Sequence, residues 1–198
     1  LEQAYDNFEL IYIDNGSSDG SLEFARSRFP AIRTISNRKN LGYAGAYKRV
    51  LEKIFKENYD AAVLLNADVV VEKSWLKELV ESAYADKNIA LAQPKIFLFG
   101  EGKSDLANSF GNKINFLGFG FCGHYGKKDS AEFQKDRDIT YASGASLLIK
   151  KEPYEAIGGL DGDFFSYLED QDLGWRAKMQ GYRIVLAARS KIWHKYKF

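Results

Sequence analysis

The chain has 198 residues, of which 45% are hydrophobic and 15% aromatic, enough for one well-buried domain. Its 28 basic and 27 acidic side chains nearly balance, which argues against a nucleic-acid partner. The single cysteine excludes an internal disulfide and a cysteine metal cluster, and it fits a reducing compartment such as the cytoplasm. No apolar run approaches the ~20 residues that span a bilayer, so we expect no transmembrane segment.

Short apolar runs alternate with helical patterns through the first half of the chain. We expect strands at residues 9–13, 31–36 and 61–66, and helices over residues 21–28, 47–55 and 74–84. The continuous apolar run AAVLLN at 61–66 is typical of a parallel strand that is covered on both faces. The alternation predicts an α/β domain with a mainly parallel sheet.

The second half of the chain is less regular. Residues 89–99 read as a strand in which Pro94 implies an edge position or a bulge. Residues 100–138 show no clear pattern, and such a long stretch is usually a functional loop region or disordered. Loops on a rigid scaffold usually set specificity, so this stretch is our candidate for a recognition region. Order returns with the segment 141–151, a helix from near Glu169, and a last strand over 183–188.

Polar clusters follow three of the expected strands. They are Asp14, Asn15 and Gly16; Asn37, Arg38 and Asn40; and Asn66, Ala67 and Asp68. Ligands of open α/β sheets bind at the carboxyl ends of the strands. Asn, Asp and Gly also dominate ordinary turns, so turn chemistry explains any one cluster equally well. Three clusters at one edge of a sheet favour a ligand site.

A family resemblance is carried by five stretches that follow one another over nearly the whole chain. They read IDNGSSDGS, NRKNLGYAGAYKRV, LLNADVVV, YASGASLLIKK and AIGGLDGDFFSYLEDQDLGWRAKMQGYRIVLAARSKIWH. Together they resemble family 2 glycosyltransferases of the GT-A fold, and most closely the bacterial rhamnosyltransferase-like members. The resemblance implies one Rossmann-like domain over residues 1–198, with helices on both faces of the sheet. Family members usually open with a strand that this sequence lacks, so we expect an N-terminal truncation.

The resemblance also implies an activity. Family members transfer a sugar, with inversion, from a nucleotide-sugar donor that is UDP-, dTDP- or GDP-linked. They use a divalent cation, Mn²⁺ or Mg²⁺, and a glycan or lipid-linked acceptor, as in cell-wall or polysaccharide biosynthesis. We therefore expect a hexosyltransferase that works in the cytoplasm or at the inner face of the membrane. The ending KIWHKYKF mixes lysines with aromatics, and a peripheral membrane contact there stays open.

Most of the expected site residues belong to the donor. In the family pattern, Asp14 matches the acid that contacts the base or ribose, and Asn15 and Gly16 shape its turn. The remaining matches to the donor pocket are Arg38 and Asn40 in the second strand-end loop, Gly42 and Gly45 where backbone approaches the ligand, and Ser143 and Gly144 in a small-residue turn near the donor sugar and diphosphate.

The metal site is expected at a third strand end. Asn66-Ala67-Asp68 matches the family's D-x-D element with Asn in first place. Asp68 is then the main metal ligand, and Asn66 contacts the ribose or a metal-bound water. His194 matches a histidine that completes the site, and imidazole suits manganese better than magnesium. The alternative is a histidine packed between Trp193 and Tyr196.

Three carboxylates crowd the stretch YLEDQDLGWR. Acids at the start of a helix are favoured by its dipole, which is one explanation. In the family the Asp of the Glu-Asp pair is the base that activates the acceptor hydroxyl, so we assign Asp170 to this role. Glu169 is the second choice, or it hydrogen-bonds the acceptor. Asp172 lies four residues before Arg176 and is expected to form a helical ion pair.

Two other functions compete with an active transferase. One is a non-catalytic module that keeps the fold and binds a nucleotide sugar. The other is a nucleotidyltransferase that makes sugar nucleotides, which shares the strand–helix alternation. The Glu169-Asp170 block argues against the second alternative, and the joint presence of Asp68, Asp170 and His194 argues against the first.

Overall fold

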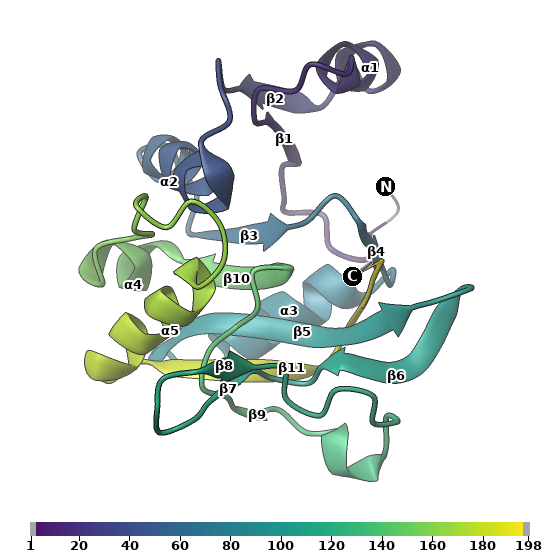
Figure 1. Ribbon diagram of the computed structural model, residues 1–198, viewed down its shortest axis with the longest axis vertical. Helices are drawn as coiled ribbons and strands as arrows, with labels where there is room; N and C mark the ends of the chain where they lie inside the picture. Colours follow the sequence, from purple (N-terminus) through teal and green to yellow (C-terminus); the bar gives the residue numbers. More distant parts are fainter. Residues whose placement is uncertain (1–2, 196–198) are drawn as a thin grey trace.

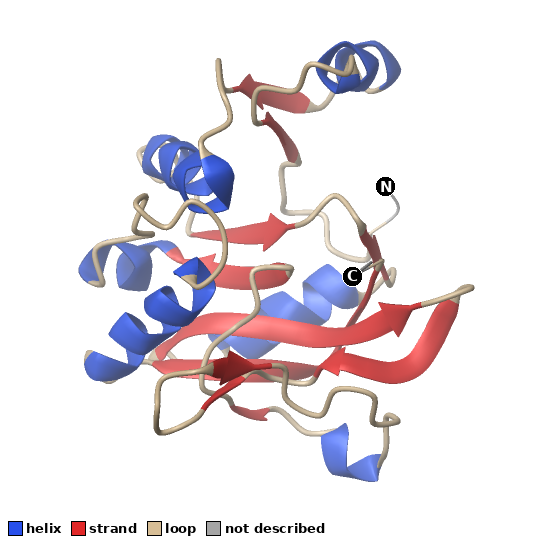
Figure 2. Ribbon diagram, in the orientation of Figure 1, coloured by secondary structure: helices blue, strands red, loops and turns tan. Residues whose placement is uncertain are grey.

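A mixed sheet lies at the centre of the computed structural model, which describes residues 3–195 (Figures 1 and 2). Its strands are β3 (Ala61–Leu65), β4 (Val69–Val71), β5 (Ile89–Phe99), β6 (Lys103–Ser109), β9 (Arg137–Asp138), β10 (Ser146–Lys150) and β11 (Arg183–His194). The spatial order is β3-β10-β5-β11-β4, while β6 pairs with β5 and β9 pairs with β11. The expected α/β fold is confirmed.

The strand directions differ from the mainly parallel sheet that the sequence predicted. Among the described strands of this sheet, only β5 and β11 pair in parallel. The pairs β10–β3, β10–β5, β11–β4, β11–β9 and β5–β6 are all antiparallel. A continuous apolar run shows that a strand is covered on both faces, and it carries no information about direction.

Helices cover both faces of the sheet, as expected. They are α2 (Gly42–Ile54), α3 (Trp75–Tyr84), α4 (Lys151–Ala156) and α5 (Glu169–Met179), whereas α1 (Ser21–Arg28) lies away from this sheet. Strand residues alternate between the two sides: Leu147 and Ile149 pack in the cluster formed with α2, α4 and α5, whereas Leu148 packs in the cluster formed with α3. In Figure 1, α3 lies behind the sheet. In the described part of the chain, no helix has the length and apolarity needed to cross a membrane.

A small parallel pair stands beside the main sheet. It consists of β1 (Ile11–Asp14) and β2 (Arg33–Ser36), close to the strands expected from sequence. Figure 1 shows this pair and α1 at one end of the molecule, with α2 between them and the sheet. Arg33 donates to both carboxylate oxygens of Glu57 at 2.7 and 2.8 Å, which ties β2 to the segment after α2.

Residues 100–138 are more ordered than the sequence suggested. They contain β6, the short hairpin strands β7 (Lys113–Ile114) and β8 (Gly120–Phe121), a 3₁₀ turn over Ala131–Phe133, and β9. The buried Lys95 donates to Asp129 at 2.8 Å, so an ion pair from β5 holds this stretch against the sheet. The expectation of an irregular segment is wrong, because long-range contacts rather than local periodicity order it.

Pro94 lies inside the sheet and not at its edge. Its strand, β5, pairs with β10 on one side and with β11 on the other. Pro94 is opposite Ala187, after which the register jumps to Lys191. The extra residues of β11 form a bulge beside Pro94, which has no N–H to donate. Of the two alternatives predicted from the sequence, an edge position or a bulge, the bulge is confirmed.

Candidate functional site

Asp14 ends β1 and is 2% exposed. Its carboxylate accepts the backbone N–H groups of Gly16 and Ser17, both at 3.3 Å, and the Ser36 hydroxyl at 3.0 Å. Hydrogen bonding from Ser17 above all, and also from Ser36, outweighs burial and holds the pKa of Asp14 below its ordinary value. This side chain therefore stays ionised and acts as a fixed acceptor.

Asn15 joins the loops that follow β1 and β2. It donates to Asn40 Oδ1 at 2.9 Å and to the Gly42 carbonyl at 3.1 Å, and it accepts from Asn37 Nδ2 at 3.0 Å and Leu41 N–H at 3.1 Å. The two clusters predicted at these strand ends are thus brought together. Asn37, a member of the second cluster without an assigned role, is buried. Arg38 is exposed in the same loop.

Gly16 and Gly42 both lie in the left-handed region, with φ of 80° and 70°. A Cβ on Gly42 would collide with the carbonyl of Phe165, and the next residue, Tyr43, donates its N–H to that same carbonyl at 2.7 Å. The close approach seen at Gly42 is therefore to the chain itself. Gly45 lies inside α2, where a Cβ would be 3.2 Å from Leu41 Cβ. An approach of either glycine to a ligand stays a prediction.

A chain of hydrogen bonds runs from α2 to α5 through Gly144. Tyr43 donates its hydroxyl to the Gly144 carbonyl at 2.5 Å, and the Gly144 N–H donates to Asp170 Oδ2 at 2.8 Å. The other oxygen of Asp170 accepts the N–H of Gln171 at 2.8 Å. Sequence reasoning placed Tyr43 in a loop and missed this role, because α2 begins at Gly42, earlier than expected.

The turn at Ser143 and Gly144 is small because the protein itself crowds it. A Cβ on Gly144 would lie 3.1 Å from the Tyr43 hydroxyl and 3.5 Å from Glu169 Oε1. Ser143 N–H donates to the fully buried Gln93 at 2.8 Å, and the Ser143 hydroxyl accepts the N–H of Ala145 at 3.3 Å. These bonds fix the peptide that faces Asp170.

Glu169 and Asp170 form the first turn of α5. Burial raises the pKa of both carboxyls, and for Glu169 the negative charge of Asp170 adds to the effect. Glu169 is 5% exposed, and within residues 3–195 its buried Oε2 has no hydrogen-bond partner. Both groups are therefore better proton acceptors than an ordinary surface carboxylate.

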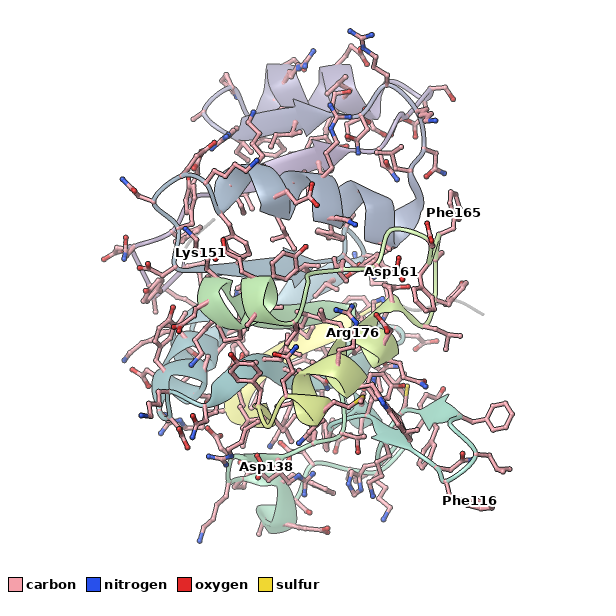
Figure 3. All side chains as sticks on the ribbon, turned by 90° about the vertical axis from the view of Figure 1, so that its left-hand side faces the viewer. Phe116, Asp138, Lys151, Asp161, Phe165 and Arg176 are labelled. Carbon is pink, nitrogen blue, oxygen red and sulfur yellow. The ribbon has the colours of Figure 1, made fainter. Side chains whose placement is uncertain are left out.

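The backbone just before these carboxylates is strained. Tyr167 and Leu168 both have φ of 70°, a conformation that costs non-glycine residues on the order of 1–3 kcal/mol each. The helix start is held from the other side, where Arg176 donates to Asp172 at 2.6 and 3.0 Å and to the Ile157 carbonyl at 2.6 Å. The expected Asp172–Arg176 ion pair is confirmed. Figure 3 shows Arg176 on α5 and Phe165 in the loop above it.

Asp68 and His194 meet beyond the end of β3. Asp68 Oδ1 lies 3.2 Å from His194 Nε2, and the Asp68 carbonyl accepts the N–H of Lys195 at 2.9 Å. His194 is 6% exposed, while the side chain of Asp68 is 49% exposed. Asn66 is tied to the Gly144 turn, because its N–H donates to the Ala145 carbonyl at 3.1 Å. The structure thus brings the two expected metal ligands together.

This pair fits a divalent cation with open positions. Two ligands of an octahedral ion at about 2.1 Å lie about 3 Å apart, close to the observed separation. One carboxylate oxygen and one imidazole nitrogen form a reasonable donor set for manganese. In the part of the chain that the structure describes, no group of three or more His, Cys, Asp or Glu side chains converges on one point. Water and a bound phosphate group would supply the remaining ligands.

The predicted site residues form three groups along one side of the sheet. The first joins Asp14 with the loops after β1 and β2, the second joins Gly144 with the start of α5, and the third is the Asp68–His194 pair. The start of α2 links the first group to the second through Gly42 and Tyr43. Backbone hydrogen bonding at Asn66 links the second group to the third.

This architecture, with its strand-end carboxylates, defines a GT-A type domain. The chain belongs to glycosyl transferase family 2, whose family model matches residues 1–158, and the resemblance seen in the sequence is confirmed.

Two curated relatives span most of the chain. It is 24% identical over 201 residues to the N-acetylglucosaminyl-diphospho-decaprenol L-rhamnosyltransferase of Mycobacterium tuberculosis, covering 93% of this chain and 66% of the relative. It is 26% identical over 194 residues to the succinoglycan biosynthesis protein ExoA of Rhizobium meliloti, covering 94% of this chain and 53% of the relative. The chain thus spans about two thirds or less of the length of these relatives.

A solved structure shares the fold. The crystal structure of GalNAc-T7 with UDP, GalNAc and Mn²⁺ superposes with a TM-score of 0.75 at 14% identity, covering 96% of this chain and 38% of that one. At this level of identity the likeness concerns the fold alone.

Proposed function

We propose that this domain transfers a sugar, with inversion, from a nucleotide-diphosphate donor to a hydroxyl group of a glycan or lipid-linked acceptor. The observation that carries the proposal is the placement of Asp170. It is a partly buried carboxyl with a raised pKa, fixed by the Gly144 peptide, in a family 2 domain that also holds the Asp68–His194 pair.

The donor nucleotide belongs, in this proposal, to the loops after β1 and β2. Asp14 stays ionised and accepts hydrogen bonds from the base or ribose of the nucleotide. Asn15 and Asn40 are engaged with each other and keep these loops in place, while the exposed Arg38 is free to reach the nucleotide from solvent. Ser143 and Gly144 lie beside the donor sugar, where a larger side chain would also clash with Tyr43.

Asp68 and His194 would hold the divalent cation. When bound, this ion neutralises the negative charge that develops on the departing nucleoside diphosphate. The solved structure of similar fold contains Mn²⁺ and UDP, and the donor set here also favours manganese.

Asp170 removes the proton from the attacking hydroxyl of the acceptor. A positioned carboxylate that does so typically contributes ~10²–10⁴ in rate. Direct displacement by this hydroxyl inverts the configuration of the transferred sugar. Glu169 is buried next to Gly144, and burial together with the charge of Asp170 raises its pKa, so it is the second candidate for the base.

The proposal is tested with a panel of UDP-, dTDP- and GDP-sugars, with and without manganese. Ligand at a hundred times its Kd adds about 2.7 kcal/mol, or roughly 5–10 °C for a domain of this size. We expect a manganese-dependent rise in Tm with one nucleotide and, with acceptor present, release of its nucleoside diphosphate. A Tm rise without any release would favour the non-catalytic module, and no rise with any nucleotide would contradict donor binding.

A further inference from the structure

A cavity of about 660 Å³ lies apart from the residues discussed so far. It is bounded by the β7–β8 hairpin, by residues 137–140 and by the end of α5. Four basic side chains line it: Lys113, His124, Arg137 and Lys178. Figure 3 shows the hairpin projecting from the body of the molecule below α5, with Phe116 at its tip.

The cations of this cavity outnumber its one carboxylate. Asp138 accepts a hydrogen bond from Arg183 at 3.0 Å, and its charge also acts on Lys178, whose pKa is lowered by burial. Among the described residues, neither Lys113 nor Lys178 forms an ion pair within 4.0 Å. Burial first, and then the cations Arg137 and Lys113, lower the pKa of His124. The cavity therefore presents a net positive potential to whatever enters it.

Two of the four side chains are held in place by an aromatic ring. The Arg137 guanidinium stacks over Phe133 at 4.7 Å and donates to the Phe110 carbonyl at 3.3 Å. The His124 ring packs on the edge of the same phenylalanine at 4.8 Å, from a backbone with φ of 66°. A preorganised guanidinium flanked by lysines is an arrangement suited to phosphate oxygens.

The cavity adjoins the proposed catalytic base. Gln171, the residue after Asp170, donates to the Gly118 carbonyl in the hairpin loop at 2.7 Å. A Cβ on Gly120 would meet Gln171 and the Tyr141 hydroxyl, whereas the next residue, Phe121, lines the cavity. One strand of the hairpin therefore separates the cavity from the start of α5.

The hairpin tip is strongly apolar. Phe116, Leu117 and Phe119 are 95%, 66% and 67% exposed around Gly118. Asn115 holds the tip rigid, since its side chain accepts the N–H groups of Leu117 and Phe119, both at 3.0 Å. A cationic cavity at the base of a rigid apolar tip matches a molecule with a phosphate group and a hydrocarbon part.

We propose that this cavity is an anion site that takes the phosphate or diphosphate group of the acceptor, with the hairpin tip against the apolar part of the same molecule. The assignment to the acceptor rests on the transferase function proposed above. The anion site itself rests only on the cavity and its four side chains.

The test measures binding of inorganic phosphate, pyrophosphate and dodecyl phosphate by calorimetry, in EDTA and without nucleotide. Wild type is compared with the double variant Lys113→Gln/Lys178→Gln. The control is Lys53→Gln/Lys56→Gln, which removes the same charge from exposed lysines outside the cavity. We expect pyrophosphate affinity to fall at least tenfold in the cavity variant only. Equal affinity in all three proteins, or no binding to wild type at 10 mM, would overturn the site.

The alkyl chain of dodecyl phosphate distinguishes a lipid-linked phosphate from a free anion as the ligand of the cavity. We expect dodecyl phosphate to bind wild type at least tenfold more tightly than inorganic phosphate, and Phe116→Ser/Phe119→Ser to lose this advantage. Equal binding of the two phosphates would assign the cavity to a free anion and refute the lipid-linked acceptor. The manganese-dependent rise in Tm with nucleotide should persist in the cavity variant. Loss of donor binding can therefore be told apart from loss of the anion site.

Discussion

Asp14, at the donor end of the site, and Glu169, at the catalytic end, are both buried carboxylates. Their pKa values nevertheless shift in opposite directions. Asp14 accepts hydrogen bonds from two backbone N–H groups and one hydroxyl, and its pKa is lowered. Glu169 is nearly as buried, its Oε2 finds no hydrogen-bond partner in the described residues, and its pKa is raised. Burial alone does not decide whether the pKa of a carboxyl group rises or falls. Hydrogen bonds donated to the charged form lower the pKa, and without them burial raises it. The proposed function needs this difference, with a fixed acceptor at Asp14 and a basic group at the start of α5.

The largest expected effect is on the rate of transfer, at the start of α5. Asp170→Asn removes the proton acceptor while keeping an oxygen that accepts the Gly144 N–H. We expect kcat to fall at least ~100-fold with donor affinity unchanged, as measured by initial rates and by nucleotide titration. Transfer at near wild-type rate would remove Asp170 from the mechanism and leave Glu169 as the base.

The next effect concerns the contact between Gly42, at the start of α2, and the Phe165 carbonyl in the loop before α5. Gly42→Ala places a methyl group against the Phe165 carbonyl at positive φ, whereas Gly20→Ala adds one at φ of 81° with no atom within 4 Å. The control should cost about 1–2 kcal/mol of unfolding free energy from its backbone alone. We expect Gly42→Ala to cost at least about 1 kcal/mol more in urea unfolding. Equal costs would mean that the approach to Phe165 relaxes freely.

A smaller effect is expected at the donor end. Asn15→Ala removes a side chain with four hydrogen bonds that joins two loops. We expect about 1–3 kcal/mol less unfolding free energy and weaker nucleotide binding, with the rate at saturating donor largely kept. A stable variant with normal donor affinity would show that the loops are fixed by other contacts.

The smallest effect is a difference in pH dependence between the two ends. The lowered pKa of Asp14 stabilises the fold above its ordinary value of about 3.9, so Asp14→Asn should destabilise at pH 7 and less so as the pH falls. The raised pKa of Glu169 costs stability above the ordinary value of about 4.3, so Glu169→Gln should stabilise at pH 7 and lose this advantage near pH 4. Urea unfolding at pH 4, 5.5 and 7 measures the change in unfolding free energy for both variants. Changes of the same sign at pH 7 would contradict the opposite pKa shifts of Asp14 and Glu169.

Much of the scaffold was predictable from the sequence because its signals are local. The expected helix over residues 21–28 is α1, and α3 and α5 begin within a residue or two of their predicted starts. Asp14 is the last residue of β1 and Asn66 directly follows β3, close to the strand ends that the apolar runs indicated. The pairing of Asp68 with His194 came from the family resemblance, since no local pattern joins residues so far apart.

The remaining features depend on contacts that no local pattern encodes. The left-handed pair at Tyr167 and Leu168 lies in the loop whose Phe165 packs on Gly42, and neither residue type favours that conformation. The order in residues 100–138 comes from the pairing of β6 with β5 and of β9 with β11, together with the ion pair between Lys95 and Asp129. His124 had no assigned role in the sequence, and only folding brings it beside Arg137 and Lys113.

The most direct test compares Asp68→Ala and Asp170→Asn in one nucleotide-binding experiment. The Tm of each variant and of wild type is measured with the preferred nucleotide, with and without manganese. The account predicts that Asp170→Asn keeps the full manganese-dependent rise and that Asp68→Ala loses it. A manganese-dependent rise that survives in Asp68→Ala, or that disappears in Asp170→Asn, would contradict the separation of donor binding from proton transfer.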